Sequence, residues 1–356
     1  MFGWIVSRRR AAYARGRRAI KRLPVPVLVV GNIVVGGAGK TPAVLAVVEA
    51  LKRLGHRPAI VSRGYGASQR HPRLVTPVSS ASEVGDEPLL LYLQSQVPVA
   101  VGVDRSAAGS TVLRAHPEID CIVCDDGLQH YGLHRDFELA VIARDKGLGN
   151  GALLPAGPLR EPLERLSEVD AVVWHGEQQH AQSGQLPAVI SLLNQAALPQ
   201  FALQLSMAAP VPFQEWKAKL FHHSLHSDAA GNFNQDAVLM REAHPAFEEP
   251  ALAADSEQAW SVWQGNWVHA VAGIAHPQRF FNALSQHGMQ VMAHSFSDHH
   301  RFAEDELTFP EPYPIMMTEK DAVKCLDLNL DRHWVVSLHA QLETGAIAWL
   351  HSKLES

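Results

Sequence analysis

A glycine-rich turn between an apolar run and a helix-forming run offers the most specific chemistry in the sequence. It consists of Gly36, Gly37, Ala38, Gly39, Lys40 and Thr41. Glycines allow backbone N–H groups to close around phosphate oxygens, and the N-terminus of the helix that follows attracts negative charge. The lysine of such a loop reaches the outer phosphates of a nucleotide, and the next hydroxyl binds Mg²⁺. The turn predicts a phosphate-binding loop; a plain glycine turn is the alternative, because Val34 stands where the strict pattern has glycine.

Two adjacent carboxylates form the second candidate feature. The apolar run Ile119–Cys124 leads directly into Asp125 and Asp126. An apolar strand that ends in aspartate is the usual holder of the Mg²⁺ that accompanies a bound nucleotide. Because the two carboxylates repel each other, a divalent cation is the expected compensation. The alternative is an ordinary Asp-Gly turn.

Three further polar segments could belong to a site, and for the first two of them the sequence leaves a structural and a functional interpretation open. Asp86 precedes a predicted helix, so it is either the N-cap of that helix or a base in the phosphate cleft. Asp298 and His299 lie in a loop, either as surface residues or as a carboxylate that orients an imidazole. The segment 318–321 follows a predicted strand, where Thr318 is expected to cap a helix. Its lysine and aspartate are adjacent, and this spacing does not fit the guanine-binding motif.

The composition predicts a globular protein in a reducing compartment. The chain has 356 residues, of which 47% are apolar and 19% charged, so a disordered protein is excluded. Three cysteines cannot build a disulfide framework, and Cys121 and Cys124 are expected to be buried thiols. No apolar run approaches the ~20 residues of a membrane span, and no signal peptide is expected.

The basic residues are distributed unevenly. Residues 1–22 hold Arg8, Arg9, Arg10, Arg15, Arg17, Arg18, Lys21 and Arg22 and no acidic residue. The remainder is acidic overall, which argues against a nucleic-acid binder. On a helical wheel most apolar side chains of this arm share one arc, away from nearly all of the basic ones. The pattern favours a helix that lies on an anionic membrane with its apolar side down. A helix docked on its own domain is the main alternative.

Strands alternating with helices predict a doubly wound, mostly parallel α/β sheet of the P-loop NTPase type. We expect a basic amphipathic helix over residues 1–24, a P-loop core domain over residues 25–205 and a smaller α/β domain over residues 206–356. The smaller domain contains a long, His-rich insertion at about residues 213–260, to which we assign no role. The expected strands of the core are Val27–Val30, Ala59–Ser62, Val99–Val101, Ile119–Cys124, Leu139–Ala143 and Ala171–Trp174. Those of the smaller domain are Val268–Ile274, Gln290–His294, Ile315–Thr318 and Trp334–Leu338.

Several segments, in this order, resemble the tetraacyldisaccharide 4′-kinase family of Gram-negative bacteria. They are VLVVGNIVVGGAGKTP, VSRGYG, VGDEP, CDDGLQHYGLHRD, GALLPAGPLREPLERL and MMTEKDAVKC, spread from about residue 25 to residue 325. The resemblance implies transfer of the ATP γ-phosphate, with Mg²⁺, to the 4′-hydroxyl of a tetraacylated glucosamine disaccharide 1-phosphate. The product would be lipid IVA, a precursor of lipid A. The resemblance also implies peripheral attachment to the cytoplasmic face of the inner membrane through residues 1–24, without an obligate protein partner.

The resemblance assigns roles residue by residue. Lys40 and Thr41 would serve the phosphates and Mg²⁺. Asp125, Asp126 and Glu161 would lie on the metal side, and Asp126 and Lys40 would also take part in the reaction. Asp86 would be the catalytic base and His299 its partner, supplied by the second domain on hinge closure. The substrate contacts would be Gln129, His130 and Arg160.

Two other functions are weighed against the lipid kinase. A P-loop kinase of a soluble small molecule would need neither lipid nor the basic arm. A membrane-targeting ATPase that acts as a nucleotide switch would hydrolyse ATP slowly until stimulated by a partner. Partition-type ATPases of that class carry a lysine where this chain has Val35, which argues against the switch.

Overall fold

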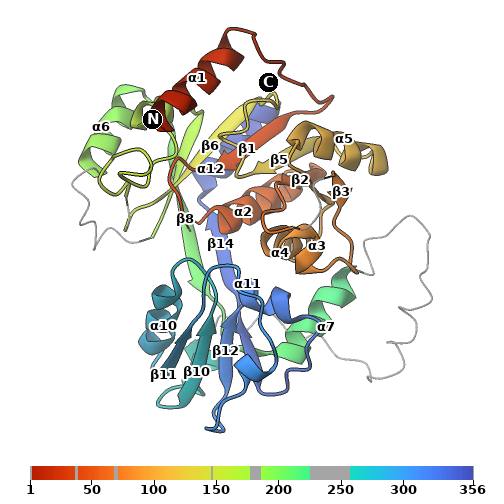
Figure 1. Cartoon of the computed structure of the whole chain (residues 1–356), viewed down its shortest axis with the longest axis vertical. Coiled ribbons are helices and arrows are strands. Elements are labelled where there is room, and N and C mark those ends of the chain that lie inside the picture. Colours follow the sequence, from red (N-terminus) through yellow and green to blue (C-terminus); the bar gives the residue numbers. More distant parts are fainter. Residues whose placement is uncertain are drawn as a thin grey trace. The chain divides into compact units, whose positions relative to one another are not determined.

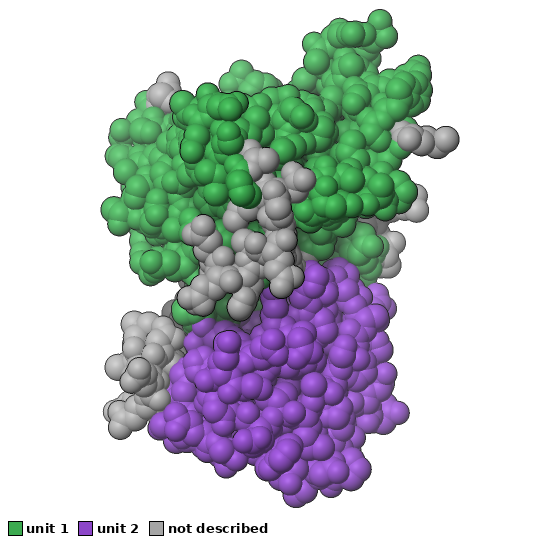
Figure 2. All heavy atoms as spheres, turned by 90° about the vertical axis from the view of Figure 1, so that its left-hand side faces the viewer, with its two compact units in different colours: residues 1–206, 338–356 green, residues 207–337 purple. Residues whose placement is uncertain are grey.

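The chain forms two compact units in this computed structural model, which describes residues 2–36, 39–67, 71–145, 147–176, 186–224 and 257–355. The first unit combines residues 1–206 with residues 338–356, and the second comprises residues 207–337 (Figure 2). The predicted insertion lies outside the described residues from 225 to 256.

A nine-stranded sheet forms the centre of the first unit, in the order β14-β8-β7-β6-β1-β5-β2-β4-β3 (Figure 1). The strands are β1 (Val27–Gly31), β2 (Pro58–Ser62), β3 (Arg73–Leu74), β4 (Val99–Val101), β5 (Cys121–Asp125), β6 (Phe137–Ala143), β7 (Ala171–His175), β8 (Gln200–Met207) and β14 (Leu338–Leu342). All ladders from β4 through β5, β1 and β6 to β8 are parallel, and β3 pairs antiparallel with β4. The prediction of a doubly wound, mostly parallel sheet is confirmed.

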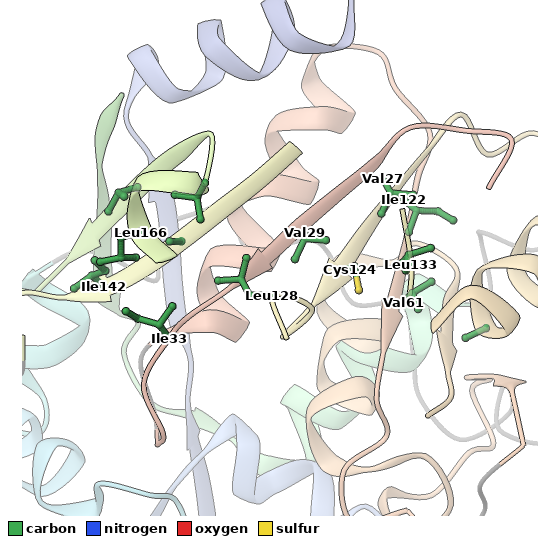
Figure 3. Close-up of a cluster of buried hydrophobic side chains, with 14 of the residues drawn as sticks. Val27, Val29, Ile33, Val61, Ile122, Cys124, Leu128, Leu133, Ile142 and Leu166 are labelled. Carbon is green, nitrogen blue, oxygen red and sulfur yellow. The ribbon is translucent and has the colours of Figure 1, made fainter. Parts of the chain in front are cut away.

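Helices follow most strands of this sheet. They are α1 (Phe2–Ala14), α2 (Lys40–Arg53), α3 (Ala81–Val84), α4 (Asp86–Ser95), α5 (Arg105–Ala115), α6 (Leu186–Gln195) and α12 (Thr344–Leu354), with a 3₁₀ turn η1 at Leu163–Glu168. Every residue of β1, β2 and β5 is buried, as expected for parallel strands covered on both faces. Val29, Val61, Ile122 and Leu128 meet in one apolar cluster (Figure 3). Cys124 belongs to the same cluster, and burial raises the pKa of its thiol to about 11.

The carboxyl end of the chain differs from the predicted domain division. We assigned residues 206–356 to the smaller domain, but residues 338–356 belong to the first unit. The predicted strand Trp334–Leu338 is in fact two strands, β13 (His333–Val336) and β14, in different sheets. The reason is tertiary: β14 hydrogen-bonds to β8, and α12 packs against α2.

The second unit is a smaller α/β layer. Its sheet has the order β11-β10-β12-β13-β9, parallel except for β9. The elements are β9 (Val211–Pro212), β10 (Trp267–Ala272), β11 (Gln290–Ser295), β12 (Ile315–Thr318), α7 (Phe213–Ser224), α9 (Glu257–Ser261), α10 (Pro277–Gln286), α11 (Glu319–Ala322) and the 3₁₀ turns η3 (Asp305–Leu307) and η4 (Val323–Cys325). The first twelve residues of the predicted insertion are thus the helix α7. Phe213, Trp216 and Leu220 lie on its buried side.

The N-terminal helix is shorter than predicted. It ends at Ala14, followed by Gly16 with a φ of 66°, a left-handed conformation that helices do not continue through. The rest of the arm lies along the first unit, because Leu23 is buried in the core cluster at 7% exposure. Lys21 and Arg22 pair with Asp104 and Asp136 at 3.0 and 3.1 Å.

The helix α1 itself is docked on the first unit. Arg10 forms an ion pair with Glu168, and the rings of Tyr13 and Tyr131 lie 5.9 Å apart. The docking predicted as the alternative to a membrane-bound helix is therefore present. Trp4 nevertheless remains 64% exposed. In the described part of the chain, no helix combines the length and apolarity that crossing a bilayer requires.

Replacing Leu23 with alanine tests whether the arm is part of the folded unit. We expect Leu23→Ala to lower the free energy of unfolding by about 2–4 kcal/mol, because a buried apolar side chain is lost and a cavity remains. Urea denaturation followed by circular dichroism measures the change. The matched control is Ile20→Ala, at a side chain that is 49% exposed, for which we expect less than about 0.5 kcal/mol. Equal effects of the two variants would contradict the docked arm.

Candidate active site

The phosphate loop leaves the carboxyl end of β1 at the centre of the sheet. The helix α2 begins at Lys40, and Gly39 precedes it with a φ of 73°. A Cβ atom at Gly39 would lie 2.4 Å from Nε2 of His175, a buried residue at the end of β7. Only glycine satisfies both the conformation and the close approach. Gly37 and Ala38, which we also predicted in this loop, lie outside the described residues.

A second segment fixes the start of the loop. Val34 forms an isolated β-bridge with Leu159, and the Val35 N–H donates to the carbonyl oxygen of Pro158 at 2.9 Å. The Arg160 N–H donates to the carbonyl oxygen of Ile33 at 2.7 Å. The segment LPAGPLRE therefore supports the start of the phosphate loop through backbone hydrogen bonds. This contact joins two of the motifs that the sequence analysis found to be specific.

The structure brings Lys40, Asp126 and Arg160 together. The Lys40 Nζ atom lies 3.7 Å from Oδ1 of Asp126, and a guanidinium nitrogen of Arg160 donates to Oδ2 of Asp126 at 2.9 Å. Asp126 has a φ of 46°, a region that few residues other than glycine adopt. Strained backbone of this kind is retained at functional sites when the surroundings hold it in place.

The two aspartates have opposite electrostatic surroundings. Burial raises the pKa of Asp125 well above its ordinary value, and the negative charges of Glu87 and Asp126 raise it further. Asp125 accepts a hydrogen bond from the Ser62 hydroxyl at 2.8 Å. Burial also acts to raise the pKa of Asp126, but Lys40 and Arg160 outweigh it and the pKa is lowered. The site is therefore short of positive charge at Asp125.

This charge imbalance fits a magnesium ion. Carboxylate and hydroxyl oxygens are the donors that Mg²⁺ prefers. Asp125 ends β5, and Thr41 lies in the first turn of α2, beside Lys40. Asn32 adds a further polar group next to the loop, since its buried carboxamide has no hydrogen-bond partner among the described residues. The donor set present thus suits a nucleotide phosphate with Mg²⁺.

Asp86 is the first residue of α4 and is buried. Its Oδ1 atom accepts a hydrogen bond from the Glu87 N–H at 2.9 Å. The N-cap position belongs to Gly85, so the interpretation of Asp86 as the N-cap residue is wrong. The first turn of α4 lies within electrostatic range of Asp125, because Glu87 contributes to the raised pKa of that carboxyl.

Fully buried Glu161 and half-buried Gln129 form a hydrogen-bonded pair next to Arg160. The Gln129 amide donates to Glu161 at 2.8 Å and to the carbonyl oxygen of Asn32 at 2.9 Å. The Tyr131 hydroxyl donates to the other oxygen of Glu161, which is fully buried. Burial raises the pKa of Glu161. Both carboxylate oxygens of Glu161 thus accept hydrogen bonds from the protein, and the bond from Gln129 holds that amide in place.

The remaining predicted residues lie in different surroundings. His130 is half-buried, and burial together with Arg105 and Arg135 lowers its pKa to about 4. It is therefore a neutral hydrogen-bonding group at physiological pH. His299 belongs to the second unit, has a φ of 62°, and its Nε2 atom lies 3.7 Å from Oδ2 of Asp298.

Two residues of the site were missed by the sequence analysis. Arg105 was not singled out, but it is buried and helps to lower the pKa of Asp126. Asn32 was not singled out either, although it is buried and stands directly between β1 and the loop. Neither residue carries a signal in the sequence that sets it apart, because its burial depends on packing in the fold.

Comparison with known proteins agrees with this geometry. The family model for tetraacyldisaccharide-1-phosphate 4′-kinase matches residues 1–355. The chain belongs to this kinase family. A tetraacyldisaccharide 4′-kinase of Azoarcus sp. (strain BH72) is 41% identical over 355 residues, covering 100% of this chain and 89% of the relative. One from Pseudomonas paraeruginosa (strain DSM 24068 / PA7) is 40% identical over 352 residues, covering 99% and 90%. The resemblance read from the motifs is confirmed.

The fold of the 4′-kinase family is also found among solved structures. A crystal structure of the Aquifex aeolicus LpxK, described as an "apo" form in complex with ATP, matches with a TM-score of 0.71 and 24% sequence identity. The match covers 99% of this chain and 95% of that chain. The agreement extends over both units of the fold.

Replacing Gly39 with alanine tests the phosphate loop. We expect Gly39→Ala to weaken Mg·ATP binding by about tenfold or more, since a Cβ atom there meets a buried imidazole and the backbone is left-handed. Isothermal titration calorimetry measures the affinity.

The matched control for this loop is Gly55→Ala. Gly55 has a φ of 88° but faces open space, so the variant carries the backbone strain without the collision. We expect it to lower the melting temperature while nucleotide affinity stays within about twofold. Equal nucleotide binding by both variants would contradict the site.

Proposed function

We propose that the chain transfers the γ-phosphate of ATP to the 4′-hydroxyl of a tetraacylated glucosamine disaccharide 1-phosphate, which gives lipid IVA in the synthesis of lipid A. The membership of the chain in the 4′-kinase family over residues 1–355 supports this function. The observation that carries it is the cluster of Lys40, Asp125, Asp126 and Arg160 where β1 and β5 end.

Phosphoryl transfer needs positioning and charge neutralisation rather than covalent help from the protein. We propose that Lys40 contacts the outer phosphates of ATP, and that Thr41, Asp125 and Asp126 hold Mg²⁺. When bound, Mg²⁺ neutralises the charge of the phosphates. Arg160 and Lys40 are both anchored on Asp126, so one carboxylate sets the position of two cations.

The acceptor hydroxyl needs a base within hydrogen-bond reach. Asp86 is the proposed base, because it is a buried carboxyl group in the first turn of α4, and that turn lies within electrostatic range of Asp125. His299 is the proposed partner of Asp86, with Gln129 and His130 as contacts of the disaccharide. The chain passes between the two units at residues 206–207 and 337–338, and the proposal requires closure of the units on the bound substrate.

A lipid acceptor also gives α1 a function. Trp4 and Ile5 are 64% and 52% exposed on α1, and the Arg8 guanidinium lies 5.0 Å above the Trp4 ring. An aromatic ring combined with arginines suits the headgroup region of an anionic membrane. We propose peripheral attachment of α1 to the cytoplasmic face of the inner membrane, where the acyl chains of the substrate stay in the bilayer.

The direct test is incubation with γ-labelled ATP and the tetraacylated disaccharide 1-phosphate in mixed micelles. We expect a labelled lipid from the unaltered chain and none from Lys40→Met. Labelling of a soluble sugar acceptor without lipid would favour the small-molecule kinase, and ATP hydrolysis without a labelled product would favour the nucleotide switch.

Removal of the proposed base should slow the reaction without removing the nucleotide. We expect Asp86→Ala to lower kcat by about 10²–10⁴-fold, the usual contribution of a positioned base, while the Kd for Mg·ATP stays within about threefold. Steady-state kinetics and calorimetry measure the two quantities. The control is Asp120→Asn, directly before the amino end of β5, with kcat expected within about twofold. Unchanged turnover of Asp86→Ala would exclude Asp86 as the base.

Two variants that lose the same charge test the membrane surface. Arg8 and Arg9 are exposed on α1, whereas Lys21 and Arg22 are paired with acidic residues of the first unit. We expect the double variant Arg8→Gln, Arg9→Gln to bind anionic vesicles about thirtyfold more weakly, since each basic residue near such a surface contributes about 1 kcal/mol. The double variant Lys21→Gln, Arg22→Gln should change binding by less than about threefold. Sedimentation with phosphatidylglycerol vesicles at two salt concentrations measures both, and equal losses would contradict the assignment to α1.

A further inference from the structure

The segment TEKDAVK, Thr318–Lys324, holds a buried ion pair that the proposed reaction does not use. Lys324 Nζ lies 2.6 Å from Oδ1 of Asp321, and the two side chains are 3% and 0% exposed. The Thr318 hydroxyl donates to the other oxygen of Asp321 at 2.7 Å. A buried charge pair of this kind costs desolvation and is kept only where its hydrogen bonds are complete.

The ion pair clamps the end of β10. The Gly273 N–H donates to Asp321 at 3.1 Å, and Lys324 donates to the carbonyl oxygen of Gly273 at 3.1 Å. Both backbone groups of one residue are thus bound by one ion pair. The clamp fixes the turn between β12 and α11 against β10.

The loop that contains His299 packs on the same glycine. A Cβ atom at Gly273 would lie 3.3 Å from Cβ of His300 and 3.2 Å from Cζ of Phe302. The Lys324 ammonium also lies 5.0 Å from the centre of the Phe302 ring. The clamp therefore supports the residues that directly follow His299.

Lys320 reaches from this clamped turn to the His299 loop. Its Nζ atom lies 3.5 Å from Oδ1 of Asp298, and Oδ2 of Asp298 lies 3.7 Å from Nε2 of His299. Two further ion pairs lie close to the loop, His300 with Glu306 at 3.0 Å and Lys324 with Asp321. Arg301, which follows His300 in the chain, is exposed. Lys320, Asp298 and His299 thus form a row of ionisable groups that ends on the imidazole.

We propose that Lys320 is a positioning residue for His299, acting through Asp298, and that the buried Asp321–Lys324 pair fixes the turn from which Lys320 reaches the loop. The inference rests on the proposed function, in which His299 assists Asp86. Lys320 keeps the Asp298 carboxylate in place, and that carboxylate holds the imidazole in a left-handed backbone turn. The competing role, a direct contact of Lys320 with the nucleotide, is an outcome of the test.

The experiment compares Lys320→Met, which keeps the length of the side chain, with Lys320→Arg, which keeps its charge. We expect Lys320→Met to lower kcat by about tenfold with the KM for ATP within about twofold, because the imidazole is less well placed. The loss of a neighbouring cation favours the protonated imidazole, so the acid limb of the kcat profile should move up by about 0.5 pH unit. Lys320→Arg should restore the profile. The control is Lys219→Met, at an exposed lysine of α7 paired with Glu215.

Asp298→Asn should shift the acid limb of the kcat profile in the direction opposite to Lys320→Met. Loss of folding would not produce opposite shifts in the two variants. Removal of the anion beside His299 favours the neutral imidazole, so the acid limb should move to lower pH while kcat falls. Melting curves establish that each variant is folded. Opposite shifts from Lys320→Met and Asp298→Asn support the proposal, since a purely structural role would move neither limb.

Three results would overturn the inference, and they separate it from the proposed function. If the unaltered chain labels the lipid and His299→Gln is slow, but Lys320→Met equals the unaltered chain, the positioning role alone fails. A raised KM for ATP with an unchanged pH profile would assign Lys320 to the nucleotide instead. If the unaltered chain does not label the lipid, or His299→Gln is fully active, the premise and the inference fail together.

Discussion

The site depends on an excess of negative charge at the carboxyl edge of the first sheet. Asp125 and Asp126 are adjacent, and Glu87 adds a third carboxylate within electrostatic range. Burial makes this crowding more costly, because the low-dielectric interior screens the repulsion poorly. Lys40 and Arg160 neutralise Asp126 but leave Asp125 with only a serine hydroxyl as its hydrogen-bond partner among the described residues. The fold thus holds a position that a divalent cation would stabilise, next to a loop shaped for phosphates.

A continuous set of contacts joins this site to the N-terminal helix. Arg160 contacts Gln129, and Gln129 is held by Glu161. Glu161 accepts from Tyr131, whose ring contacts Tyr13 of α1. The charge of Arg10 on α1 also helps to counter the raised pKa of Glu161. The membrane-facing helix of the proposal is therefore packed on the residues that position the proposed substrate contacts, which is the arrangement that a lipid acceptor requires.

The parts of the fold that the sequence predicted well are those set by local pattern. β1, α2 and β5 follow from apolar runs and a glycine turn, because a strand buried on both faces must be apolar throughout. The end of α1 at Ala14 has a local cause, the left-handed backbone of Gly16. The separation of β13 from β14 instead depends on a distant partner, β8 in the sheet. Spacing along the chain contains no information on such partners.

The same distinction holds within the site. The aspartates and the loop were predicted from their order along the chain, whereas the hydrogen bonds of Glu161 were not, since the role of Glu161 came from the family resemblance alone. Only the fold shows that Tyr131 and Gln129 occupy both of its oxygens. Buried Arg105 was missed for the same reason, because its burial is created by the packing of α5 and not by its neighbours in sequence.

Each unit holds a non-glycine residue with a left-handed backbone in a turn that neighbouring contacts support. Asp126 and His299 have φ values of 46° and 62°, and neither is glycine. In the first unit these contacts come from the segment LPAGPLRE, which binds the loop, and from its Arg160, which binds Asp126. In the second they come from the buried Asp321–Lys324 pair on Gly273. Since a buried ion pair contributes little net stability compared with apolar packing, its retention there is best explained by the orientation that it enforces.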